Sequence, residues 1–77
     1  MSVTDSSRAQ RHHRTVRRLP WVLERLGLSR SMVYLRLDRR SKYYDEHFPK
    51  RVRLGAGAIG FIEDEVEAYI EHLMAQR

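Results

Sequence analysis

The sequence of 77 residues contains no cysteine, only two prolines and a single tryptophan. The lack of cysteine excludes a disulfide scaffold, a cysteine-ligated zinc module and a thiol enzyme, and it is compatible with a reducing environment. No apolar run approaches the roughly 18 residues that a membrane span needs, and residues 1–18 lack the apolar segment of a secretory signal. We therefore expect a cytoplasmic protein that does not associate with membranes.

Catalysis and cofactor binding also lack support in the sequence. Its length suffices for one small domain, whose core is too small to exclude water around a reaction, and no acid and base are paired. The adjacent His12 and His13 have no further ligand at metal-binding spacing, so no metal site is predicted. The glycines within residues 55–60 stand in a chain too short for the βαβ unit that gives a phosphate-binding glycine motif its meaning. We predict neither an enzyme nor a cofactor-binding protein.

The sequence does have a strong separation of charge. Fifteen lysines and arginines against ten acidic residues give a net charge of +5. Residues 1–18 carry +4 from five arginines and one aspartate, residues 19–58 carry +5 from nine cations and four acids, and residues 59–77 carry −4 from one arginine and five acids. A chain polarised in this way can present one basic surface to a polyanion, which makes nucleic acid the leading partner. The alternative, that the arginines line solvated helix faces, stays open at this point.

The N-terminal segment differs in composition from the rest of the chain. Residues 1–17 are basic and polar, and they contain too few apolar side chains to bury a surface of their own. We predict a flexible basic arm over residues 1–17 and a folded domain over residues 18–77. Such an arm either contacts phosphates or the minor groove of DNA, or it is a tail without a partner.

The first predicted element is a short helix that begins at Leu19, with Pro20 in its first turn, where a missing N–H costs nothing. Its apolar stripe has helical spacing and consists of Leu19, Val22, Leu23 and Leu26. Gly27 suits the left-handed conformation that ends a helix, and Ser29 is a good N-cap for the next one. The second helix is predicted from Arg30 to about Arg40.

Two helices joined through residues 27–29 have the layout of a helix-turn-helix, in which the N-terminus of the second helix contacts bases in the major groove. The residues at that N-terminus are Ser29, Arg30, Ser31 and Tyr34. Arg39, Arg40 and Lys42 near its C-terminal end favour DNA as the partner, although cations there also suit the helix dipole. An ordinary helical hairpin has the same layout, and this alternative also stays open.

A β-hairpin, or wing, is predicted after a polar loop over residues 41–47. Residues 51–54 alternate polar and apolar side chains, which is typical of a half-buried strand with Val52 and Leu54 facing inward. Residues 55–58 are predicted to form a flexible turn, and residues 59–62 a return strand. The outer face of the first strand presents cations to phosphates, and these are Lys50, Arg51 and Arg53.

The last predicted helix covers about Glu63 to Met74. Acidic residues stand in its first turn, where carboxylates complement the helix dipole. Its apolar stripe consists of Val66, Tyr69, Ile70 and Leu73. Because Glu67 and Glu71 would repel DNA, we place this helix away from the groove. The predicted fold is of the α+β class: a small winged helix-turn-helix with two short helices, a two-stranded wing and a C-terminal helix.

Four motifs follow one another along this framework. They are Arg18-Leu-Pro20 before the helix of Val22-Leu-Glu24, then Gly27 to Tyr34, then Phe48-Pro-Lys50 leading to Val52–Gly55, and finally Ile59-Gly-Phe61 before Glu65–Ile70. In this order and spacing they resemble the AlpA-type prophage regulators, small winged-helix relatives of the MerR-like and excisionase DNA-binding domains. The resemblance covers about residues 18–74.

The resemblance implies a transcriptional regulator or an excision cofactor that binds double-stranded DNA near an integrase gene or its attachment site, without enzymatic activity. It implies that Arg53 and the turn after it lie near the minor groove, and that the major groove receives Ser29, Arg30, Ser31 and Tyr34. Several positions depart from the family pattern. Leu35 and Arg36 stand in reversed order, which leaves open which of them faces DNA, and Gly57 replaces an arginine of the wing.

The predicted DNA-contact set therefore consists of Ser29, Arg30, Ser31, Tyr34, Arg36, Arg39, Arg40, Lys50, Arg51, Arg53 and Gly57. The first hypothesis is a sequence-specific regulator located with the nucleoid. A second is an excisionase, a recombination directionality factor that bends DNA for integrase and whose copies contact one another through Leu35 and the arm. A third is a protein-interaction module, such as an antirepressor, whose basic face binds an acidic partner.

Overall fold

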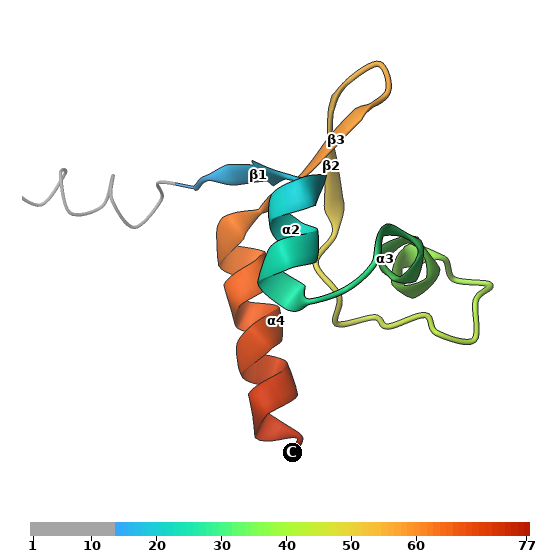
Figure 1. Ribbon diagram of the computed structural model, residues 1–77, viewed down its shortest axis with the longest axis vertical. Coiled ribbons are helices and arrows are strands. Elements are labelled where there is room, and N and C mark those ends of the chain that lie inside the picture. The colour runs from blue at the N-terminus through green and yellow to red at the C-terminus, as the bar shows by residue number, and fades with distance from the viewer. Residues whose placement is uncertain (1–13) are drawn as a thin grey trace, which may run out of the picture.

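The computed structural model describes residues 14–77, and the first 13 residues of the predicted arm, His12 and His13 included, lie outside the described residues. Its elements, in chain order, are β1 (Val16–Arg18), α2 (Leu19–Leu26), α3 (Arg30–Leu37), β2 (Arg51–Gly55), β3 (Ala58–Ile62) and α4 (Glu63–Ala75). Figure 1 shows α3 and the loop after it on one side of α2, α4 on the other side, and the β2–β3 hairpin projecting beyond the helices. The predicted winged helix-turn-helix of the α+β class is confirmed.

The turn between α2 and α3 has the predicted caps. Gly27 adopts a left-handed conformation with φ of 69°, and the N–H groups of Gly27 and Leu28 both donate to the carbonyl of Leu23, at 2.8 and 3.1 Å. The hydroxyl of Ser29 accepts the N–H of Met32 at 3.1 Å, which satisfies a donor of the first turn of α3. These local bonds fix the angle at which α3 leaves α2.

The second helix is shorter than predicted. It ends at Leu37, because Asp38 has extended backbone angles and its carboxylate accepts the N–H of Arg40 at 2.9 Å. A side chain that bonds to the backbone two residues on competes with helix continuation. Arg39 and Arg40 consequently lie in the turn after α3 and not on the helix.

The sheet has three strands where two were predicted, in the order β1-β3-β2, with both pairs antiparallel. Residues 16 and 17, predicted as part of the arm, belong to this sheet, so ordered structure begins before Leu19. Arg18 pairs with Gly60. A Cβ atom at position 60 would lie 2.6 Å from Val16 Cγ1 and 3.2 Å from the carbonyl oxygen of Arg17. Glycine at this position therefore leaves the space that β1 occupies.

The wing is a tight hairpin in which Gly55 pairs with Ala58 and Gly57 has a φ of 74°. The register shifts between Arg53 and Gly55. Val52 is half-buried as expected, but the prediction that Leu54 faces inward is wrong, since 46% of its surface is exposed. The irregular register and the projection of the tip beyond the helices leave that side chain without a core to enter (Figure 1).

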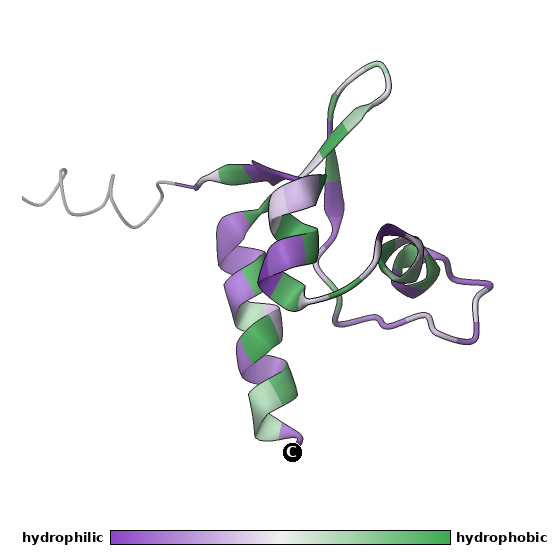
Figure 2. Ribbon diagram, in the orientation of Figure 1, coloured by the Kyte–Doolittle hydropathy of each residue, from purple (hydrophilic) through white to green (hydrophobic). Residues whose placement is uncertain are grey.

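Every helix and the β3 strand contribute to one small core. Its buried side chains are Leu19, Val22, Val33, Phe48, Phe61, Val66 and Tyr69. Phe48 comes from the loop after α3 and packs edge-on against Tyr69, with ring centroids 5.0 Å apart. Leu73 of the predicted apolar stripe is exposed, because α4 continues past the other elements. Figure 2 shows apolar residues along this free end of α4.

Among residues 14–77 no helix has the length and apolar character to cross a membrane.

Candidate nucleic-acid interface

The N-terminus of α3 presents polar and aromatic side chains to solvent. Ser29, Arg30 and Ser31 are exposed, and Tyr34 is 40% exposed. Val33, on the side of the helix that faces the core, is fully buried and anchors the helix. Because residues four apart share a helix face, Arg30 and Tyr34 form one outward ridge. This end of α3 is therefore held from behind and open in front.

Three adjoining hollows bring most of the predicted residues together. The helix–wing groove, as we name the first, lies between α2, α3 and the wing and is lined by Arg18, Leu19, Pro20, Arg30, Tyr34, Gly57 and Ile59. The second is lined by Tyr34, Leu37, Asp38, Arg39, Arg40 and Arg51. The third follows the wing and is lined by Arg51, Arg53, Gly55, Gly57, Ala58 and Ile59. Shared lining residues join the hollows into one continuous surface, which we call the α3–wing surface.

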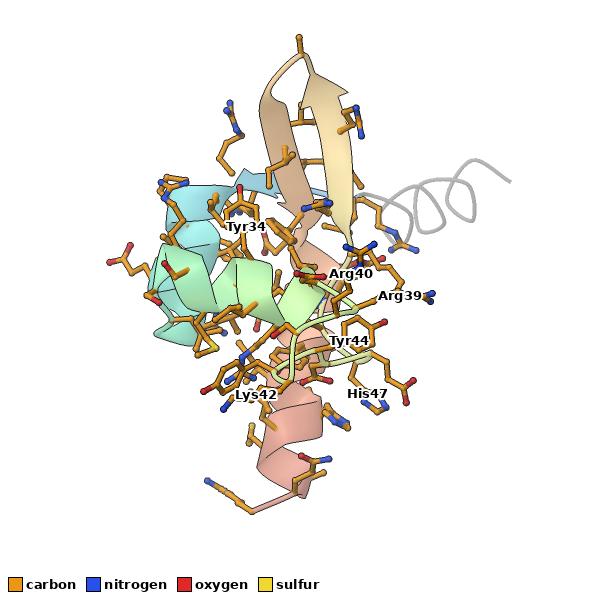
Figure 3. The ribbon with its side chains drawn as sticks, turned by 90° about the vertical axis from the view of Figure 1, so that its right-hand side faces the viewer. Tyr34, Arg39, Arg40, Lys42, Tyr44 and His47 are labelled. Carbon is orange, nitrogen blue, oxygen red and sulfur yellow. The ribbon has the colours of Figure 1, made fainter. Side chains whose placement is uncertain are left out.

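Figure 3 shows how this surface is arranged. Tyr34 lies on the side of α3 that faces the wing, and Arg39 and Arg40 lie beyond the C-terminal end of the helix. Lys50 is exposed directly before β2 and shares a further hollow with Arg39, so we include it in the α3–wing surface. The cations of the turn and of the wing thus flank the exposed ridge of α3.

The arginines next to α4 are in a different electrostatic state. Arg14 lies 3.0 Å from Asp64 and Arg17 lies 2.7 Å from Glu63. Arg25 forms a two-pronged pair with Glu67, at 2.6 and 2.7 Å, and its hydrogen bonds hold the pKa of that carboxyl below the usual range. The acidic first turns of α4 thereby compensate the cations that face them.

The cations of the α3–wing surface have no such partners. Within the part of the chain that the structure describes, no carboxylate lies within ion-pair distance of Arg18, Arg30, Arg39, Arg40, Lys50, Arg51 or Arg53. Positive charges that gather without compensation create a local potential that attracts anions. The α3–wing surface is thus the basic face of the folded domain.

Arg36 is set apart from the other predicted residues. It is partly buried, and its guanidinium donates to the hydroxyl of Tyr69 at 2.8 Å and lies 4.0 Å from the carboxylate of Asp45. The hydroxyl of Tyr69 in turn donates to Asp45 at 2.7 Å. We call these three residues the Asp45 cluster. Its neighbour Leu35 is 36% exposed, so the structure directs Arg36 toward α4 and leaves Leu35 at the surface.

The Asp45 cluster ties α3, the loop after it and α4 together. Burial raises the pKa of Asp45, but the hydrogen bonds from Tyr69 and from the backbone N–H of His47, with the nearby Arg36, outweigh it and hold this pKa below its usual value. Burial and the bond to Asp45 raise the pKa of Tyr69. The carboxylate therefore stays ionised and the phenol neutral around pH 7. The backbone N–H of Asp45 also donates to the carbonyl of Arg36 at 3.0 Å, which closes the loop onto α3.

Sequence reasoning missed two features of this site. Arg18 lines the helix–wing groove but was treated as the boundary of the arm, although it ends the stretch Val16–Arg18, which here forms β1. The Asp45 cluster joins residues that are 24 and 33 positions apart, and no local sequence pattern predicts such a contact.

Among residues 14–77 no group of three or more histidine, cysteine or acidic side chains is arranged to hold a metal ion.

Comparison with known proteins assigns the chain to a family. Residues 14–74 match the model of the family described as prophage CP4-57 regulatory protein (AlpA). The DNA-binding transcriptional activator AlpA of Escherichia coli (strain K12) is 38% identical over 53 residues, which cover 69% of this chain and 76% of that protein. No solved structure matches the chain. These matches confirm the resemblance seen in the motifs, and the chain belongs to the AlpA family of prophage regulatory proteins.

Proposed function

We propose that the protein is a transcriptional regulator that binds double-stranded DNA sequence-specifically through the α3–wing surface. The observation that carries this proposal is the contrast between its uncompensated cations and the ion-paired arginines beside α4. Uncompensated cations gain most from neutralising phosphates, because each contact releases condensed counterions. The activator AlpA, similar to this chain, is itself named as DNA-binding.

In this proposal, the exposed ridge of α3 contacts the base edges and determines the sequence preference. Arg30 has the planar fork that pairs with the O6 and N7 of guanine, and Tyr34 and Ser31 offer hydroxyls beside it. The hydroxyl of Ser29 already accepts the N–H of Met32, so Ser29 sets the position of the helix. With α3 in the major groove, the wing lies toward the adjacent minor groove. There the bare backbone of Gly57 allows close approach to the DNA.

The remaining cations act on the phosphates and carry no sequence information. They are Arg39, Arg40, Lys50, Arg51 and Arg53. Arg36 has its guanidinium engaged in the Asp45 cluster, so we assign it to holding the loop and not to contacting DNA. The proposed role is binding and not catalysis, because these side chains lie on an open surface and not in a closed site.

The place of action is a further part of the proposal, and membership of a family of prophage regulatory proteins supports it. We propose that the protein acts on the DNA of a prophage, beside an integrase gene or its attachment site, and that it is found with the nucleoid in the cytoplasm. A role as excisionase is the second candidate, and the exposed Leu35 on α3 favours it. An apolar side chain beside the DNA-reading ridge suits contact with integrase or with another copy on a neighbouring site.

Selection of binding sites from a random duplex library at about 150 mM salt tests the proposal. A single enriched motif supports the regulator, and evenly phased repeats support the excisionase. No enrichment would contradict specific DNA binding and favour a protein partner for the basic surface, as in an antirepressor.

Arg30→Ala tests the assignment of α3. We expect it to lower discrimination between the selected site and a scrambled duplex by about 1–3 kcal/mol, because one bidentate base contact is lost. Arg77→Ala removes the same charge from the end of the chain and serves as the control. Competition binding measures both variants, and full discrimination by Arg30→Ala would contradict the assignment.

A further inference from the structure

The short strand β1 places two adjacent arginines, Arg17 and Arg18, in different surroundings. Successive side chains of a strand point to opposite faces. Arg17 reaches Glu63 at 2.7 Å, and its guanidinium lies 4.9 Å from the ring centroid of Trp21. Arg18 is exposed, lines the helix–wing groove, and has no carboxylate within ion-pair distance among the described residues. One arginine is thus bound within the fold, whereas the other is left without a partner.

The backbone of Arg18 is firmly placed. It pairs with Gly60 across the sheet and is also the residue directly before the first turn of α2. The approach of β1 depends on Gly60, because a Cβ atom there would overlap Val16. One consequence of this short strand is that the side chain of Arg18 leaves a fixed point of the backbone and lines the same groove as Arg30 and Tyr34.

We propose that the helix–wing groove binds one phosphate of the DNA backbone, with Arg18 as its principal ligand. The inference rests on the proposed function, which directs α3 to the major groove and the wing to the minor groove. One sugar–phosphate strand separates adjacent grooves of a duplex, so this strand crosses the space between α3 and the wing. That space is the helix–wing groove.

The lining of the groove fits a backbone strand. Leu19, Pro20 and Ile59 contribute apolar side chains to its lining, and Pro20 has no N–H to donate. Gly57 adds no side chain that would block the strand, and a Cβ atom there would meet nothing within 4 Å. Because Arg30 is assigned to base reading, a phosphate in this groove takes its hydrogen bonds from the guanidinium of Arg18. An arginine fork suits two phosphate oxygens at once.

The salt dependence of DNA binding tests this phosphate site. We expect Arg18→Gln to bind the selected duplex and a scrambled duplex more weakly by the same factor, and to lower the slope of log affinity against log salt by about 0.9. Between about 50 and 200 mM salt this slope change corresponds to a difference of roughly 3.5-fold. Arg18→Lys keeps the charge and should retain most of the slope.

Arg17→Gln is the matched control, because it removes the same charge from the neighbouring residue on the other face of β1. We expect its slope to equal that of the wild type, and thermal unfolding confirms that each variant is folded. Equal slopes for Arg18→Gln and the wild type, with wild-type binding intact, would overturn the phosphate site and leave the proposed function standing. Failure of the wild type to bind any duplex would overturn the proposed function itself, and the phosphate site with it.

Neutral methylphosphonate linkages, introduced one at a time into the selected duplex, locate the contact. The wild type should lose affinity at one linkage between the segment read by α3 and the segment near the wing, and Arg18→Gln should be insensitive to that linkage. If both proteins lose equal affinity at every linkage, Arg18 does not hold a phosphate.

Discussion

The side of the molecule that carries α4 and the side that carries α3 and the wing use arginine in opposite ways. Beside α4, Arg17 and Arg25 meet carboxylates at 2.6–2.7 Å. On the α3–wing surface, seven cations have no acidic partner among the described residues. The net charge of +5 describes neither side. The acidic residues of α4 compensate the arginines beside them, so uncompensated cations gather on the α3–wing surface.

The pairs beside α4 contribute little to stability. Ion pairs between exposed side chains are weakened by solvent screening, and the side chains of Arg25 and Glu67 are 44% and 40% exposed. Their larger effect is on the direction of the field, because a compensated arginine does not compete for DNA. Under the proposed function, the ion pairs thus help to define which face binds DNA, and the core holds the fold.

Removing equal charge from the two sides should have unequal effects, and this is the largest difference that we predict. Arg39→Gln with Arg51→Gln should weaken binding to every duplex at least about tenfold at ~150 mM salt and lower the salt slope by about 1.8, because two phosphate contacts are lost. Arg17→Gln with Arg25→Gln removes the same charge and should change binding little. Fluorescence anisotropy at several salt concentrations measures both, and equal losses would abolish the distinction between the sides.

The Asp45 cluster lies between the two sides. The substitution Tyr69→Phe removes the hydroxyl that bonds to both Arg36 and Asp45. The ring stays in the core against Phe48, but Asp45 and Arg36 lose the hydroxyl between them. We expect the free energy of unfolding to fall by about 1–2 kcal/mol. DNA binding should weaken equally for all sequences, because the loop that carries Arg39 and Arg40 is less firmly held.

Tyr43→Phe is the control for this change, since Tyr43 is exposed and its hydroxyl has no hydrogen bond to the described residues. It should leave stability and DNA binding unchanged. Chemical denaturation and competition binding measure both variants. A Tyr69→Phe protein that lost discrimination between sequences would show that the cluster acts on the ridge of α3 and not on the loop.

Acid should weaken the same junction, with the smallest effect of the three. The pKa of Asp45 is lower in the folded protein than its ordinary value of 3.8. The resulting stability is present above that ordinary value and is lost as the pH falls through the lower folded-state pKa. Denaturation midpoints between about pH 5 and 2 should therefore decline less steeply for Asp45→Asn than for the wild type. Parallel curves would show that this carboxylate does not contribute.

Local sequence signals predicted the helix-turn-helix because its determinants are local. Pro20, Gly27 and Ser29 act on the backbone within a few residues of themselves, and all three occupy the predicted positions. The wing followed from alternation and glycine. The order of these elements already indicated most residues of the α3–wing surface, and the family resemblance then drew attention to Arg36 and Gly57.

What the sequence did not predict depends on contacts between distant residues. The strand β1 exists because Gly60 leaves room for it, and Arg36 turns inward because Tyr69 and Asp45 meet it there. The end of α3 at Leu37 follows from one side-chain bond of Asp38, which propensity alone does not reveal. The sequence shows which side chains are cations, but tertiary contacts decide which of these cations form ion pairs with carboxylates.

Chemical-shift mapping of the backbone amides, during titration with the selected duplex, shows which face of the protein binds DNA. We predict that the largest changes fall on residues 29–40 and 50–58, with residue 18 beside them, and that residues 63–75 of α4 change little. Changes centred on α4 would contradict the assignment of the α3–wing surface as the face that binds DNA.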